Sequence, residues 1–210
     1  MKKYKAMLFA LPVLACVIAL PAYAAEKAQA KAAAHPAGES MVREVLERGR
    51  PSAAQNIGIL APLTGTWDFT ATVRAAPGAE PERTAGTTTN EMILDDRFLS
   101  STVLGNLSIG GHEALFNGRG LLGYDNAKKS FTSVWVDTLG TGMMVGSGKY
   151  DEKEKVLKET GRFTDPLDGV EKGFRSELWF TDAEHYKRVI FTTDKSGKES
   201  KLMEFEYSRR

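Results

Sequence analysis

The chain has 210 residues, of which 42% are hydrophobic and 9% aromatic, so it is long enough for one domain with a real core and too apolar to be disordered. Its 28 basic residues nearly balance its 27 acidic ones, and both kinds are scattered along the chain. A protein that binds nucleic acid usually carries a basic stripe, so this composition argues against a nucleic-acid partner.

The N-terminus has the pattern of a secretory signal peptide. Three lysines precede the apolar run 6–20, and the tripeptide Ala22-Tyr23-Ala24 supplies the small residues that a signal peptidase reads. The apolar run is shorter than the roughly 20 residues of a membrane-spanning helix. We therefore expect cleavage after Ala24 to remove residues 1–24. The mature protein is then periplasmic or secreted, with no transmembrane segment.

Cys16 leaves a second interpretation open, in which this residue is acylated and becomes the first residue of a lipoprotein. The preceding Val13-Leu14-Ala15 loosely resembles a lipobox. The apolar run continues beyond Cys16, however, whereas a lipobox usually closes it, so cleavage after Ala24 is favoured. The chain's only cysteine then leaves with the signal peptide, and the mature protein has no disulfide. Its formal charge is −2, from 25 basic and 27 acidic residues.

Two segments precede the predicted globular part. Residues 25–38 are rich in Ala and have no apolar periodicity, which is typical of a flexible tether. In the lead-in 39–59, Val42, Val45 and Leu46 fall at i, i+3 and i+4, which predicts a short amphipathic helix at its start.

Residues 60–210 show the pattern of strands and turns, with no long helical window. Between Leu63 and Val73 the odd positions are apolar or small and the even positions polar, the period of two expected of a half-buried strand. The complete set of candidate strands is Leu63–Arg74, Ala85–Leu94, Phe98–Leu104, Glu113–Tyr124, Phe131–Val136, Gly142–Tyr150, Val156–Phe163, Glu171–Phe180, Tyr186–Thr193 and Ser200–Tyr207.

Short loops rich in Gly, Asp, Asn and Pro separate these strands, which favours antiparallel hairpins over a parallel sheet. About ten strands in sequence need their edges closed, and an up-and-down barrel achieves this. We therefore predict an all-β fold, a single antiparallel up-and-down barrel preceded by a short amphipathic helix. Glycines crowd the fourth and sixth strands, which indicates either bulges with sharp coiling or close sheet packing.

A set of short motifs runs through the predicted barrel. They are Leu60-x-Pro62-Leu63-x-Gly65-x-Trp67, Asn90-Glu91, Arg97-Phe98-Leu99, Gly123-Tyr124-Asp125-Asn126, Trp135-x-Asp137, Gly140-Thr141-Gly142, Tyr150-Asp151, Asp165-Pro166 and Met203-Glu204-x-x-Tyr207. As a set, and over about residues 60–209, they resemble the bacterial domain-of-unknown-function family 1579. Each motif alone is weak, and the set is specific.

The resemblance implies a compact barrel of the calycin kind, the broad group that holds lipocalins, fatty-acid-binding proteins and nitrobindin-like haem proteins. Gly65-x-Trp67 is similar to the lipocalin first-strand motif, in which the Trp plugs one barrel end and a late Arg stacks on it. Arg188 and Arg209 are both candidates for that partner. The family carries no established activity, so the resemblance implies a fold and leaves the function open.

Four residues are candidate ligand contacts. Trp135 and Asp137 lie two positions apart on one predicted strand, so an aromatic plate and a carboxylate share one face. Glu91 and Arg175 are charges in the middle of predicted strands, and an Arg that reaches the interior would suit a ligand carboxylate. The alternative for all four is an ion-pair lattice on the exterior or a buried structural pair.

The sequence contains no recognisable catalytic or metal-binding set. His185 is the one candidate haem ligand, but its place at a strand end favours a surface role. No His, Cys, Asp or Glu group has zinc-site spacing. We therefore expect no cofactor, and a barrel that binds a small, mostly apolar ligand without catalysis. Two alternatives stay open: an enzyme with Asp137 as general base in a cavity, and a structural or interaction protein with a packed core. The oligomeric state is not determined by the sequence.

Overall fold

The computed structural model describes residues 36–74, 79–109, 111–166, 168–193 and 198–210. The predicted signal peptide, Cys16 and residues 25–35 of the predicted tether lie outside these ranges. Helix α2 (Pro36–Arg48) contains the predicted amphipathic segment, and its Val42, Val45 and Leu46 are exposed. Within the described ranges, no helix is both long and apolar enough to cross a membrane.

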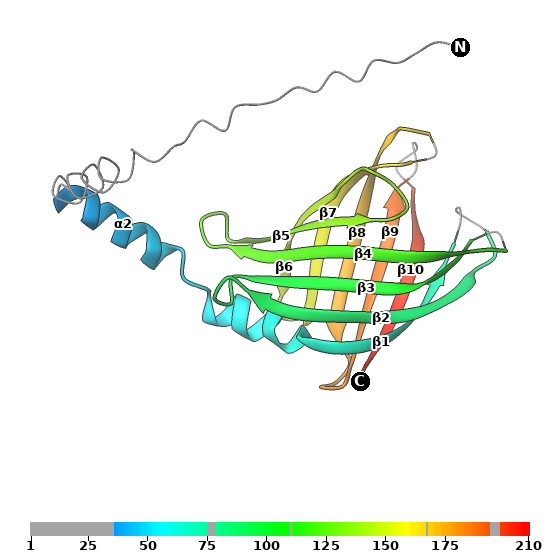
Figure 1. The fold of residues 1–210 in the computed structure, drawn as a ribbon, viewed down its shortest axis with the longest axis horizontal. Coiled ribbons are helices and arrows are strands. Elements are labelled where there is room, and N and C mark those ends of the chain that lie inside the picture. Colours follow the sequence, from blue (N-terminus) through cyan, green and yellow to red (C-terminus); the bar gives the residue numbers. More distant parts are fainter. Residues whose placement is uncertain (1–35, 75–78, 110, 167, 194–197) are drawn as a thin grey trace, which may run out of the picture. The chain divides into compact units, whose positions relative to one another are not determined.

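Ten antiparallel strands form a closed barrel (Figure 1). Each strand pairs with the next one along the chain, and β1 pairs with β10 to close the sheet. All ten predicted strands are confirmed, and the up-and-down topology with them. The strands are β1 (Gly65–Val73), β2 (Glu82–Ile93), β3 (Phe98–Ile109), β4 (His112–Asp125), β5 (Ser130–Asp137), β6 (Met144–Asp151), β7 (Val156–Thr164), β8 (Glu171–Phe180), β9 (His185–Thr193) and β10 (Glu199–Arg209).

Two short helical turns, η1 (Ala53–Leu60) and η2 (Ala61–Leu63), lead into β1. The sequence predicts Leu63 as the first residue of the strand, whereas it ends η2. The reason is local, because the N–H of Thr64 donates back to the carbonyl of Ala61 at 3.0 Å. Gly65 then takes φ +112°, a left-handed conformation that favours glycine, and β1 begins there.

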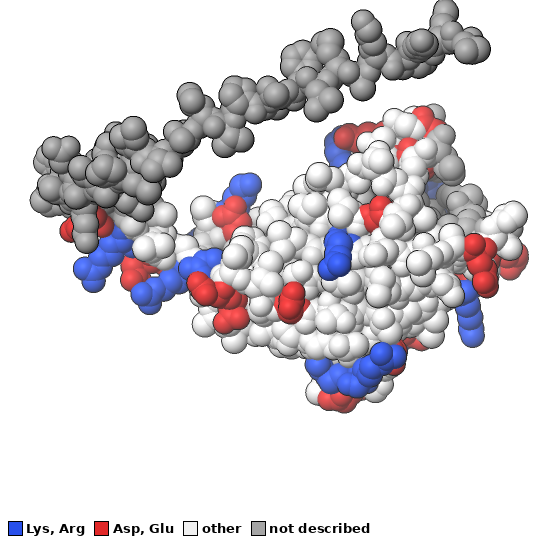
Figure 2. All heavy atoms as spheres, in the orientation of Figure 1, with Lys and Arg blue, Asp and Glu red and all other residues white. Residues whose placement is uncertain are grey.

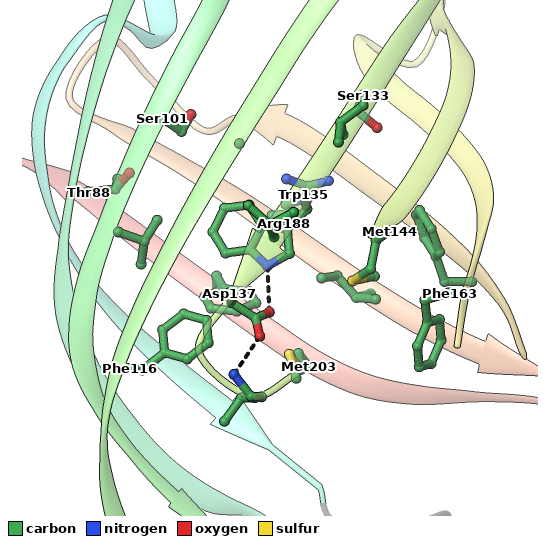
Figure 3. A pocket seen from close by; sticks show the side chains of 18 of the residues that line it. Thr88, Ser101, Phe116, Ser133, Trp135, Asp137, Met144, Phe163, Arg188 and Met203 are labelled. Carbon is green, nitrogen blue, oxygen red and sulfur yellow. Dashed lines mark hydrogen bonds between the residues drawn. The ribbon is translucent and has the colours of Figure 1, made fainter. Parts of the chain in front are cut away.

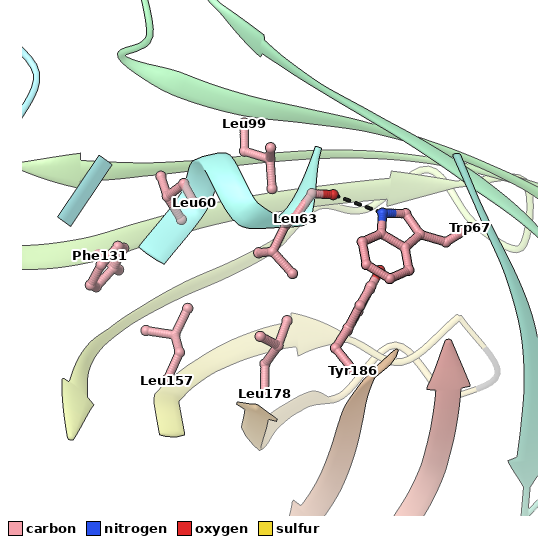
Figure 4. Close-up of a cluster of buried hydrophobic side chains, with 8 residues drawn as sticks. All are labelled: Leu60, Leu63, Trp67, Leu99, Phe131, Leu157, Leu178 and Tyr186. Carbon is pink, nitrogen blue, oxygen red and sulfur yellow. Dashed lines mark hydrogen bonds between the residues drawn. The ribbon is translucent and has the colours of Figure 1, made fainter. Parts of the chain in front are cut away.

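Trp67 plugs the barrel end that η1 and η2 enter (Figure 4). Its side chain is fully buried, and its Nε1 donates to the carbonyl of Leu63 at 2.9 Å. The ring meets Tyr186 edge to face at 4.7 Å between centroids. The guanidinium of Arg209 lies 4.0 Å from the indole centroid, a cation–π contact. Arg209, and not Arg188, is therefore the late arginine that stacks on this Trp.

A hydrophobic cluster fills this closed end of the barrel. Its buried members come from the lead-in turns and from several strands around the barrel: Leu60, Leu63, Trp67, Leu99, Phe131, Leu157, Leu178 and Tyr186. Asn56, itself buried, fastens η1 to the barrel, because its Nδ2 donates to the carbonyl of Arg97 at 2.9 Å. The turns η1 and η2 are thus part of the core and close this end of the barrel.

The outer surface differs between the two sides of the barrel. On β8 to β10, ion pairs join different strands: Lys187 of β9 pairs with Glu206 of β10, and Arg175 of β8 pairs with Glu199 of β10. Figure 2 shows few charged residues over β2 to β5, the strands nearest the viewer. Exposed apolar residues occur there, including Leu121 and Val134, which are paired across β4 and β5.

Replacing Trp67 with Ala should lower the free energy of unfolding by about 3–5 kcal/mol, because loss of a fully buried ring leaves a cavity and removes one of the two hydrogen bonds to the Leu63 carbonyl. The control is Trp179→Ala, a strand residue outside this cluster, with an expected loss of about 1 kcal/mol. Urea titration followed by circular dichroism measures both. Equal losses would contradict the role of Trp67 as the plug.

Candidate ligand-binding cavity

The barrel interior contains a cavity of about 770 Å³. It extends from the closed-end cluster to the opposite end, where the loops after β5 and β7 line it through Leu139, Met143 and Pro166. This volume falls in the range of about 300–1,000 Å³ typical of small-molecule sites. The apolar part of the lining includes Val103, Phe116, Phe163, Phe174, Met203 and Phe205.

Inward-facing glycines allow large aromatic rings to lie flat against the wall. A Cβ at Gly118 would lie 2.2 Å from Cζ2 of Trp135, and one at Gly161 would lie 2.6 Å from the ring of Phe174. The pairing of β4 with β5 and of β6 with β7 has no register shift. Of the two predicted explanations for these glycines, close packing is the one that the structure supports.

Trp135 and Asp137 both line the cavity, as their spacing predicts (Figure 3). Nε1 of Trp135 donates to Oδ2 of Asp137 at 2.7 Å, and the N–H of Leu139 donates to Oδ1 at 2.9 Å. Phe116 lies nearly parallel to the indole, at 17° and 6.3 Å between centroids. The carboxylate thus fixes the orientation of an aromatic wall.

A polar cluster lies in the same cavity, on β7, β8 and β9. Arg188 donates from Nη2 to Oε2 of Glu159 at 3.3 Å and from Nε to the hydroxyl of Ser176 at 3.1 Å. Glu159 is 2% exposed and Ser176 fully buried, whereas the Arg188 side chain is 29% exposed. Because Arg188 lines the cavity, its guanidinium is the accessible part of this cluster (Figure 3).

Two tyrosines contribute further polar groups to the lining. Tyr186 and Tyr207 stack at 4.0 Å between centroids, and both line the cavity. Burial raises the pKa of Tyr207 to about 12, and burial likewise raises the pKa of Tyr186 well above its ordinary value. Both hydroxyls are therefore neutral at physiological pH.

The other predicted contacts lie outside the cavity. Glu91 is exposed, and the residues on either side of it along β2, Asn90 and Met92, face the interior. Arg175 donates to both carboxylate oxygens of Glu199, from Nε at 2.8 Å and from Nη2 at 2.7 Å. This pair belongs to the exterior lattice that was the alternative interpretation.

His185, the candidate haem ligand, is also on the outside of the barrel. Its ring is exposed, and Nδ1 lies 2.8 Å from Oδ1 of Asp182. It is not among the cavity-lining residues. In the part of the chain that the structure describes, no three His, Cys, Asp or Glu side chains gather as metal ligands would.

Sequence reasoning missed Arg188 and Glu159 as a pair. A signal for Glu159 was present, because it shares strand parity with Leu157 and Phe163, both of which face the interior. Arg188 gave no such signal, since apolar residues occur on both faces of its strand. Only the ring of strands brings the two side chains together, 29 positions apart in the chain.

A closed meander of ten strands around an internal cavity defines a calycin-like barrel. The chain belongs to the family described as "Protein of unknown function (DUF1579)", whose profile matches residues 53–209. Among curated proteins, no sequence matches this chain significantly.

Two solved structures are similar to this chain. Rv2717c from M. tuberculosis superposes with a TM-score of 0.54 at 12% identity, covering 75% of this chain and 98% of that one. The S-type phycobiliprotein lyase CPES from Guillardia theta has a TM-score of 0.49 at 11% identity, covering 78% and 95%. At such identities the likeness to Rv2717c shows the barrel fold alone.

Replacing Gly118 with Ala should push the Trp135 indole off the wall and break its hydrogen bond to Asp137, because the new Cβ would overlap the ring. Near-UV circular dichroism and tryptophan fluorescence should both change. Gly142→Ala is the control, since its nearest neighbours lie 4.0 Å from a new Cβ. Unchanged spectra for Gly118→Ala would contradict the flat placement of the indole.

Proposed function

We propose that this protein binds a small, mostly apolar ligand inside the barrel, without catalysing a reaction. The observation that carries the proposal is the cavity of about 770 Å³ within a closed, well-formed barrel. An empty apolar space forgoes the dispersion contacts of a packed interior, so a cavity of this size is destabilising unless something occupies it. This space also favours a binding role over the structural alternative, a barrel with a packed core.

The residues that line the cavity suit a ligand with one large apolar part. The Trp135 and Phe116 rings offer a flat surface, and methionines at positions 144 and 203 offer flexible contacts nearby. A few polar groups, including the partly exposed Arg188, would fix the orientation of the ligand. Both oxygens of Asp137 accept hydrogen bonds from neighbouring residues, which favours an orienting role over that of a general base.

A filled cavity should abolish binding. Ser101 lines the cavity. Its neighbour Ser100 does not, and it pairs across the strands with the exposed Glu91. Ser101→Phe and Ser100→Phe therefore form a matched pair of variants, one facing the interior and one facing outward. Binding of the neutral dye N-phenylnaphthylamine, followed by fluorescence, should weaken at least about tenfold in the first variant and remain in the second. Equal affinities in the two variants would contradict binding inside the barrel.

The catalytic alternative has its own test. If Asp137 were a general base, Asp137→Asn would abolish any turnover found in a substrate screen, whereas an orienting role predicts that turnover is absent in both proteins. A reaction that the wild type catalyses and Asp137→Asn does not would replace the binding proposal.

We further propose that the protein acts outside the cytoplasm, on the strength of the signal-peptide pattern in residues 1–24. Expressed as the full chain in a Gram-negative host, it should appear in the periplasm with Ala25 as its first residue, as intact mass shows. Ala24→Leu should accumulate as the precursor, because a large residue blocks the peptidase site. A membrane-bound product that starts at an acylated Cys16 would instead establish the lipoprotein interpretation.

A further inference from the structure

The charges that line the cavity do not suit an anionic ligand. Among the described lining residues, three carry carboxylates, Asp137, Glu159 and Asp165, and one carries a guanidinium, Arg188. Lys172 bonds to Asp165 and offsets that charge. The described charged groups in and next to the cavity therefore sum to a negative value, so an additional anion meets no net attraction.

Arg188 is the group in the cavity best placed to bind a polar ligand atom. Its Nε and Nη2 are used by Ser176 and Glu159, while Nη1 makes no hydrogen bond to any described residue. The side chain is 29% exposed and lines the cavity. The contacts of Nε and Nη2 hold the guanidinium in place, and Nη1 can donate a hydrogen bond to an acceptor atom of a ligand.

Glu159 sets which acceptor is suitable. It accepts one hydrogen bond through Oε2, and Oε1 is buried without a partner among the described residues. A ligand carboxylate on Arg188 would place a second anion beside this buried one, and like charges in a water-poor site disfavour each other. An uncharged acceptor avoids that repulsion. Because Glu159 is 2% exposed, it acts on the ligand through its charge and not by direct contact.

Building on the binding role proposed above, we propose that this cavity selects amphipathic ligands whose polar end is uncharged and accepts a hydrogen bond from Arg188. A primary amide or an alcohol has this chemistry. The corresponding carboxylate of the same chain length does not. Arg188 binds the acceptor atom, and Glu159 is a positioning residue that also excludes anions.

The wild-type protein tests the preference directly. Dodecanamide and dodecanoic acid, each kept below its aggregation limit at neutral pH, compete with N-phenylnaphthylamine for the cavity. The amide should displace the dye at a concentration about tenfold lower than the acid. An acid that competes as well as the amide, or better, would overturn the proposal.

Glu159→Gln tests the cause of the preference. The substitution keeps the size of the side chain and removes its charge, which leaves Arg188 as an uncompensated cation. The ratio of the two affinities should shift by at least about tenfold toward the acid. In Arg188→Met both compounds should compete more weakly than in the wild type, because the hydrogen-bond donor is lost while the carboxylate of Glu159 remains. A ratio unchanged in a folded Glu159→Gln protein would overturn the role of Glu159, and if that variant does not fold, the wild-type comparison still decides the preference.

The two proposals fail in different ways. If the wild type shows no saturable dye binding, or if Ser101→Phe leaves dye binding intact, the binding function itself is overturned, and the ligand class with it. If the dye binds in the cavity and the acid outcompetes the amide, binding stands and only the proposed ligand class is wrong.

Discussion

The carbonyl oxygen of Leu63 is the point on which the closed end of the barrel depends. It accepts hydrogen bonds from Nε1 of Trp67 and from Nδ2 of Asn90, both at 2.9 Å. These bonds tie η2 to β1 and β2, and the guanidinium of Arg209 on β10 stacks on the indole. The turn η2, the first two strands and the last strand are thus fixed to one another where the barrel closes. Most of the largest fully buried side chains lie here, whereas a second buried cluster, which includes Phe69 and Val103, lines the cavity wall.

Inside the barrel, glycines and aromatic residues together determine the shape of the cavity. A ring that lies flat on Gly118 occupies the wall and leaves the centre open, whereas the same ring on a wall of larger side chains would project inward. Phe174 uses Gly161 in the same way. The shape of the cavity therefore depends on small residues on one strand that face large rings on the next.

The distribution of charge carries the functional argument. Most ion pairs lie on the exterior, where each is worth little, as for Lys187 with Glu206. The pair of Arg188 with Glu159 is different, because Glu159 is buried and the guanidinium faces the cavity. A buried pair of this kind is costly compared with apolar packing, so its presence is more readily explained by ligand selection than by stability.

The sequence by itself determined the architecture: ten strands, their antiparallel order, and the interior face of well-patterned strands such as the one that contains Trp67. Alternation in a strand directly reflects burial, which is why these predictions hold. The sequence also placed Trp135 and Asp137 on one face, because that inference depends only on the alternation within a single strand. The partner of Trp67, the outward position of Glu91, the existence of the cavity and the pairing of Arg188 with Glu159 were decided only by the tertiary structure. These features depend on the register between strands and on the volume that side chains leave free. The pattern of a single strand encodes neither the register nor that volume.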